Sequence, residues 1–140
     1  MILCLVFCIC GCKEEDTNEV TEQEFRIVVL NNTNDDIKGV TLYYSVFGKN
    51  AGSIFLKGER ETVKDGETLV KTFAQSEFEK FSSLAEFEIE ALVLAKDSSA
   101  KKTVNTVKFS VTYGETYYIM IDGNLDTNFH LSKLSTPIKY

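Results

Sequence analysis

The 140-residue sequence is short of the residues that many catalytic and metal sites use. It has no tryptophan and a single histidine, His130, so a zinc hydrolase site, which takes two or three His or Cys ligands, is not expected. Beyond residue 12 it has no cysteine, so a disulfide framework spread through the fold is not expected either. The longest uncharged apolar run, residues 2–11, is too short for a membrane-spanning helix, which needs about 20 residues.

Basic residues are also scarce. The chain has 21 acidic and 15 basic residues, which gives a net charge of −6. Five of the acids lie in residues 13–23, and the rest of the chain has a net charge of only −2. Because no basic stripe is present, we do not expect nucleic-acid binding. Residues 13–23 contain one large apolar side chain, Val20, and we interpret them as an acidic flexible tether.

The first twelve residues carry the most informative motif. Residues 2–11 have the length of the apolar core of a secretory signal peptide. The segment Ile9-Cys10-Gly11-Cys12 resembles the lipobox of bacterial lipoproteins. The resemblance implies that residues 1–11 are removed and that Cys12 is lipidated, with enough acyl chains for stable membrane anchoring. Residues 12–23 then form the lipidated tether, and residues 24–140 form one domain.

Two features depart from the usual lipobox signal. Cys10 stands where Ala or Ser is common, and no Lys or Arg precedes the apolar run, so we expect the true start to lie upstream of Met1. A metal site is a weaker interpretation of the cysteines, because an uncharged apolar run supplies no polar loop that converges on an ion. Cys12 is the only cysteine that follows a small residue, as lipidation requires. The chain's four cysteines are Cys4, Cys8, Cys10 and Cys12.

The segment Lys13-Glu14-Glu15-Asp16 follows the lipobox directly. A lysine and an acidic cluster at this position resemble the surface-export signal of Bacteroidetes lipoproteins. The resemblance implies an outer-membrane protein that is exposed on the cell surface. In the alternative interpretation the acids only solvate the tether, and the domain faces the periplasm.

The rest of the chain predicts an all-β fold. Two-residue alternation recurs while helical periodicity is almost absent, as in the run from Glu86 to Ala95, where apolar residues alternate with glutamates. We expect an antiparallel β-sandwich, immunoglobulin-like or transthyretin-like, with about seven or eight strands. A small closed barrel is the alternative. The expected strands span residues 24–31, 38–47, 53–57, 67–73, 86–95, 104–112, 116–122 and 128–134.

Turn chemistry separates these strands. The Asn and Asp cluster at 31–36 predicts a turn, and residues 97–102, which include Lys101-Lys102, predict a hairpin loop. Tyr113-Gly114-Glu115 predicts a tight hairpin between the strands on either side. Ser76-Glu77-Phe78-Glu79 has the spacing of a capping box, which predicts a short helical turn near residues 76–82.

Few residues suggest chemistry. Asp122, Asn124 and Asp126 alternate as in calcium loops, but an EF-hand needs Gly and Glu where Thr127 and Lys133 stand, so we favour a polar hairpin loop. His130 alternates with apolar neighbours and is expected to be an exposed strand residue. No nearby carboxylate in the sequence orients it, as a Ser-His-Asp triad requires. We therefore predict no catalytic residue, no metal and no cofactor.

The expected function follows from the anchor and the fold. We predict a lipid-anchored, non-enzymatic binding or structural module at the outer-membrane surface, with an unknown protein or glycan ligand. Tyr43-Tyr44 and Tyr117-Tyr118 each place one ring on either face of a strand, and an outward ring can stack on a sugar or a partner. The candidate contact loops are 31–37, 48–53 and 122–128. The alternatives are a periplasmic inhibitor or assembly accessory protein, and a glycan-active enzyme that uses two carboxylates.

Overall fold

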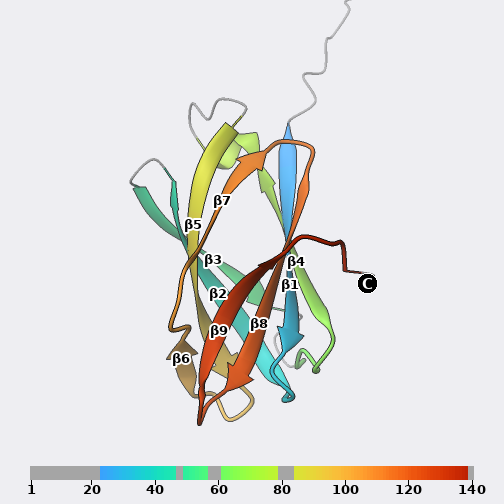
Figure 1. Ribbon diagram of the computed structural model, residues 1–140, viewed down its shortest axis with the longest axis vertical. Coiled ribbons are helices and arrows are strands. Elements are labelled where there is room, and N and C mark those ends of the chain that lie inside the picture. The colour runs from blue at the N-terminus through green and yellow to red at the C-terminus, as the bar shows by residue number, and fades with distance from the viewer. Residues whose placement is uncertain (1–22, 47–48, 57–60, 79–83, 139–140) are drawn as a thin grey trace, which may run out of the picture.

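The computed structural model describes residues 23–46, 49–56, 61–78 and 84–138, and shows an all-β sandwich (Figure 1). Cys12 and the segment from Lys13 to Asp16 lie outside the described residues. The strands are β1 (Glu24–Asn32), β2 (Ile37–Val46), β3 (Lys49–Leu56), β4 (Thr68–Ala74), β5 (Leu84–Ala95), β6 (Ala100–Lys102), β7 (Val107–Thr112), β8 (Thr116–Asn124) and β9 (Asn128–Leu134).

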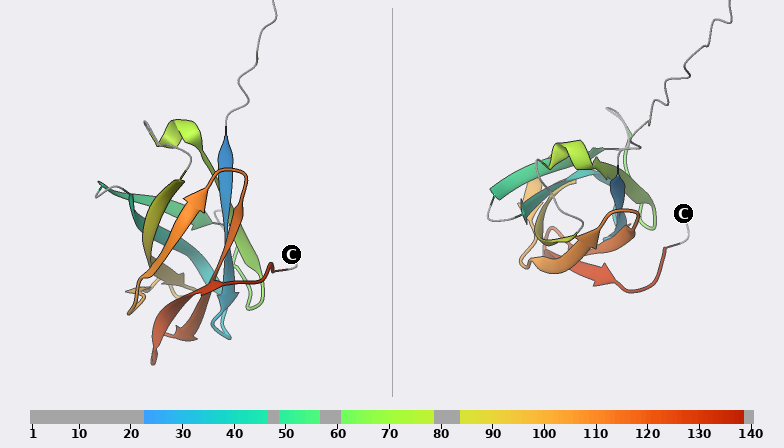
Figure 2. Two further views of the ribbon diagram at one scale, coloured as in Figure 1. Left: turned by 45° about the horizontal axis from the view of Figure 1, so that its top comes forward. Right: turned by 90° about the horizontal axis from the view of Figure 1, so that it is seen from above.

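The strands form two sheets that face each other across the core (Figure 2). The four-stranded sheet has the order β4-β1-β8-β9. The five-stranded sheet has the order β3-β2-β5-β6, and β7 also pairs with β5. The sandwich prediction is confirmed, and every pairing is antiparallel except that of β1 with β8. Whether the sandwich is immunoglobulin-like or transthyretin-like stays a prediction.

The alternation read from the sequence sets which side chains enter the core. On β5, Phe87, Ile89 and Val93 are fully buried, while Glu86 is exposed on the opposite face. Phe25 of β1 lies at the centre of an aromatic cluster, with ring centroids 5.0 Å from Phe73 and 5.4 Å from Phe87. These buried rings supply the large apolar area that a domain without tryptophan needs.

The turn at residues 113–115 differs from the predicted hairpin. Its flanking strands do not pair with each other, because β7 lies in the five-stranded sheet and β8 lies in the other. Gly114 has a φ of +89°, and its N–H donates to the Glu24 carbonyl at 2.7 Å. The Arg26 N–H donates to the Glu115 carbonyl at 3.0 Å. The turn therefore carries the chain from one sheet to the other and is held on the start of β1.

Residues 97–102 also differ from the prediction. The turn occupies only the first part of this segment, and Ala100–Lys102 forms the short strand β6, which pairs with β5. Lys101-Lys102 is therefore a strand segment. Three residues are too few to show alternation, which explains why the sequence pattern did not reveal this strand.

The predicted helical turn is present but begins earlier. Gln75–Glu77 forms one turn of 3-10 helix, η1, and the Glu77 carboxylate accepts the Ala74 N–H at 3.1 Å. The acid of the capping interaction is therefore Glu77, three residues after Ala74. Residues 79–83, and with them Glu79 of the predicted capping box, lie outside the described residues. Among the described residues, no helix has the length and apolar character needed to cross a membrane.

Candidate functional site

The predicted calcium loop is a hydrogen-bonded hairpin turn. The Oδ1 atom of Asn124 accepts the N–H of Asp126 at 2.9 Å, and the N–H and hydroxyl of Thr127 at 2.8 and 3.0 Å. Three donors therefore already surround the oxygen that a calcium ion would need. The described part of the chain holds no group of three or more His, Cys, Asp or Glu side chains that can hold a metal ion.

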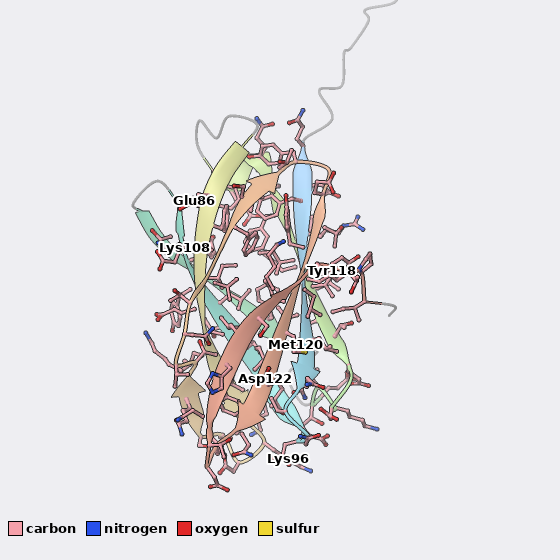
Figure 3. All side chains as sticks on the ribbon, viewed as in Figure 1. Glu86, Lys96, Lys108, Tyr118, Met120 and Asp122 are labelled. Atoms are coloured by element: carbon pink, nitrogen blue, oxygen red, sulfur yellow. The ribbon has the colours of Figure 1, made fainter. Side chains whose placement is uncertain are left out.

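His130 lies opposite a carboxylate that the sequence did not place near it. In the β8–β9 ladder its direct partner is Asp122, so both side chains lie on the outer face of the four-stranded sheet. Figure 3 shows Asp122 on β8, in line with Tyr118 and Met120. His130 is exposed, as predicted. An open sheet face gives the pair no enclosed site for a substrate, and we assign it no role.

The first predicted contact loop, residues 31–37, has a structural role. Asn31 is 1% exposed, and its Nδ2 donates to the carbonyls of Asp35 at 2.8 Å and Val63 at 3.0 Å. Its Oδ1 accepts the hydroxyl of Thr33 at 2.7 Å. These bonds satisfy buried polar groups and fix the turn between β1 and β2. The second predicted contact loop, 48–53, is mostly strand, since β3 begins at Lys49.

A groove lies on the outer face of the five-stranded sheet, and Tyr43 is its central side chain. Tyr43 points outward from β2 and is 37% exposed, whereas Tyr44 packs inward against Phe73 and Phe87. The register places Gly52 of β3 on one side of Tyr43 and Glu90 of β5 on the other. A Cβ atom built on Gly52 would lie 3.3 Å from the Tyr43 ring, so the ring rests over the glycine.

Two ion pairs lie on the β5 side of Tyr43. Lys102 Nζ lies 2.6 Å from Glu90 Oε1 and 5.3 Å from the centroid of the Tyr43 ring. Lys108 Nζ lies 3.3 Å from Glu88 Oε2. The hydrogen bond and charge of Glu90 raise the pKa of Lys102, so this amine is fully charged at neutral pH.

The groove has a volume of about 630 Å³, and both glutamates line it. It is open to solvent on the outer face of the sheet. The Thr106 hydroxyl donates to Glu88 Oε1 at 3.2 Å and lies at the β7 side of the groove. Hydroxyl, carboxylate and ammonium groups thus lie on one side of an aromatic ring. We call this surface, lined by Tyr43, Tyr44, Ser45, Ala51, Gly52, Glu88, Glu90 and Thr106, the tyrosine groove.

The sequence revealed only part of the tyrosine groove. Alternation showed that one ring of Tyr43-Tyr44 points outward and that Glu88 and Glu90 share a face. It did not show that Gly52 and Lys102 meet them, because those contacts depend on strand order. Glycine inside a strand is the available signal for Gly52, since it often marks the close approach of another group.

Comparisons with known proteins assign no family. No protein-family model and no curated protein matches the chain. A protein from Eubacterium rectale, solved by NMR, aligns with a TM-score of 0.43 and 11% identity over 87% of this chain and 97% of that one. Listeriolysin O aligns with a TM-score of 0.41 and 9% identity. This alignment covers 81% of the present chain and 23% of listeriolysin O. Neither likeness is close enough to carry an argument about function.

Proposed function

We propose that this chain is a lipid-anchored, non-enzymatic binding protein of the outer-membrane surface, and that its ligand binds in the tyrosine groove. The observation that carries the proposal is the outward ring of Tyr43, which rests over Gly52 on one side and has the ion pairs of Glu88 and Glu90 on the other side. Aromatic rings with polar surroundings are enriched at binding surfaces because they bury area at low entropic cost. The resemblance of Ile9-Cys10-Gly11-Cys12 to a lipobox supports the anchor.

The placement of the carboxylates favours binding over glycoside hydrolysis. In glycosidases two carboxyl groups flank the scissile bond from opposite sides. Glu88 and Glu90 project from one strand, on one side of an open groove, and each is bound to its own lysine. Among the described residues, no carboxylate faces them across the tyrosine groove, whose far side is lined by Gly52 and Ala51.

The first experiment tests the anchor and the side of the membrane. Intact cells that express the native protein, Cys12→Ala, or the triple variant with Glu14, Glu15 and Asp16 changed to Ala are treated with a protease. The proposal expects digestion of the native protein alone. Protection of all three forms would overturn surface exposure and would favour a periplasmic inhibitor or assembly accessory protein.

The second experiment tests the binding surface. The full-length protein carries the photo-cross-linker p-benzoylphenylalanine in place of Thr106, in the tyrosine groove, or in place of Thr72, on the outer face of the opposite sheet. Irradiation of intact cells should give a discrete cross-linked species only from position 106. Equal products from both positions, or none from position 106, would overturn the groove as the binding site.

A further inference from the structure

We infer that the tyrosine groove binds a neutral glycan chain, with one sugar ring stacked on Tyr43. This inference rests on the proposed binding function and names its ligand class. Three properties of the groove carry it: an aromatic ring that is partly exposed, hydrogen-bonding groups of both kinds beside that ring, and ion pairs whose charges cancel.

The Tyr43 ring has the environment that a sugar ring requires. One side of the ring lies against Gly52, where the absence of a side chain leaves room for it. Lys102 Nζ approaches within 5.3 Å of the centroid, which shows that a group of positive potential already reaches this ring. The C–H groups of a pyranose carry a similar partial positive charge, and they can stack on the part of the Tyr43 ring that Lys102 leaves exposed to solvent.

The rim of the groove matches the hydroxyl groups of a sugar. Carboxylates of Glu88 and Glu90 accept hydrogen bonds, while the ammonium groups of Lys102 and Lys108 donate them. The Thr106 hydroxyl can do both. Sugar hydroxyls both donate and accept, so they can bond to every one of these groups.

The charge balance selects a neutral ligand. Glu90 is paired with Lys102, and Glu88 is paired with Lys108, so the two pairs cancel. A polyanion would meet both carboxylates, and a polycation would meet both lysines. Each would have to break an ion pair that a neutral ligand leaves in place.

The position of the groove disfavours an extended peptide. Peptides that add to a sheet pair with the backbone of an edge strand. Tyr43 and Glu90 lie on β2 and β5, which are inner strands. The strand β2 pairs with β3 and β5, and β5 pairs with β2 on one side and with β6 and β7 on the other. The polar side chains of the groove therefore project from inner strands, while the edge strand β3 contributes only Ala51 and Gly52, which is an arrangement suited to a glycan.

Affinity electrophoresis tests this inference. Full-length protein in non-ionic detergent is run through native gels that contain β-glucan, xylan, mannan or galactan, with polygalacturonate as the charged polymer. We expect at least one neutral polysaccharide to retard the protein. Tyr43→Ala should weaken the retardation constant about tenfold, which corresponds to ~1.4 kcal/mol of lost stacking, while Tyr43→Phe keeps most of it.

Tyr118→Ala is the matched control, because Tyr118 lies on the outer face of the opposite sheet. Its retardation should equal that of the native protein. No retardation in any neutral gel, or equal retardation of Tyr43→Ala and the native protein, would overturn the glycan inference. The glycan inference can fail while the proposed binding function holds, and the product cross-linked at position 106 distinguishes the two cases. A protease-sensitive partner overturns only the glycan inference, whereas no product overturns both.

Discussion

The side-chain amide of Asn105 pairs with the backbone of Leu131 as a neighbouring strand would. Asn105 Nδ2 donates to the Leu131 carbonyl at 2.8 Å, and Asn105 Oδ1 accepts the Leu131 N–H at 2.9 Å. Just before it, the Val104 N–H donates to the Phe129 carbonyl at 3.0 Å. The segment between β6 and β7 therefore covers the edge of β9 and joins the two sheets on this side. Covered edges protect a sandwich from pairing with other chains.

Asn105→Ala should lower the free energy of unfolding by about 1–3 kcal/mol, because it leaves the N–H and carbonyl of Leu131 without their partners. Urea denaturation measures the change, and hydrogen exchange at the Leu131 amide should accelerate. Asn32→Ala, at an exposed asparagine of β1, is the control and should stay within about 0.5 kcal/mol of the native protein. An unchanged Leu131 exchange rate would contradict the strand-like role.

The stability of the fold should depend on Tyr44 at alkaline pH. Burial raises the pKa of Tyr44 above its ordinary value of 10.0, and the charge of Glu77 raises it further. The unfolded chain therefore loses this proton first, so the free energy of unfolding falls as the pH rises above 10.0 towards the folded-state pKa. Below that range Tyr44 is protonated in both states, so its contribution to the free energy of unfolding does not change with pH.

Tyr44→Phe should make this alkaline loss of stability less steep, and Glu77→Gln should do so to a smaller extent. Urea midpoints recorded from neutral to strongly alkaline pH measure the slope. Some slope remains in both variants, because burial also raises the pKa of Tyr113. The same slope in Tyr44→Phe as in the native protein would show that Tyr44 does not contribute.

Gly52→Ala should weaken ligand binding while the fold is kept. The added Cβ would lie 3.3 Å from Cδ1 of the Tyr43 ring, so the ring must shift by a few tenths of an ångström. We expect a severalfold weaker retardation in affinity gels and a thermal midpoint close to that of the native protein. In a Tyr43→Ala background the same change should have no effect on binding. An equal loss in both backgrounds would show that Gly52 does not act through Tyr43.

Calcium should leave the stability of the protein unchanged. The Oδ1 atom of Asn124 is already the acceptor of three hydrogen bonds from Asp126 and Thr127. Thermal midpoints in millimolar calcium and in a chelator should therefore agree, since a ligand stabilises a fold only by binding to it. Asn124→Ala should lower both midpoints equally. A calcium-dependent rise that this substitution abolishes would restore the calcium site.

Much of the fold was predictable because strand alternation is a local property. The apolar positions of β5 and the outward glutamates followed from a period of two, and the polar hairpin between β8 and β9 followed from its turn residues. The parallel pairing of β1 with β8 was not predictable, because it joins segments far apart in the sequence. For the same reason Gly114 was expected in a hairpin, although it lies in a turn between the sheets.

The tyrosine groove shows the same division at the level of a site. The sequence showed that one ring of Tyr43-Tyr44 points outward and the other inward. It also showed that Glu88 and Glu90 share one face of their strand. Lys102 was expected in a loop, and Gly52 lay in a predicted contact loop. Only the order β3-β2-β5-β6 brings both of them to Tyr43. The pattern of residues within one strand contains no information about the order of the strands in the sheet.

The central position of β1 has a mechanical consequence. The strand is paired with β4 from Glu24 to Leu30 and with β8 from Arg26 to Asn32. A force applied to the chain ahead of Glu24 pulls along the strand axis, across the perpendicular hydrogen bonds to β4 and the slanted hydrogen bonds to β8. Those bonds are then loaded together in shear instead of being unzipped one at a time. A domain held by that end and pulled through its ligand would resist extraction with both ladders at once.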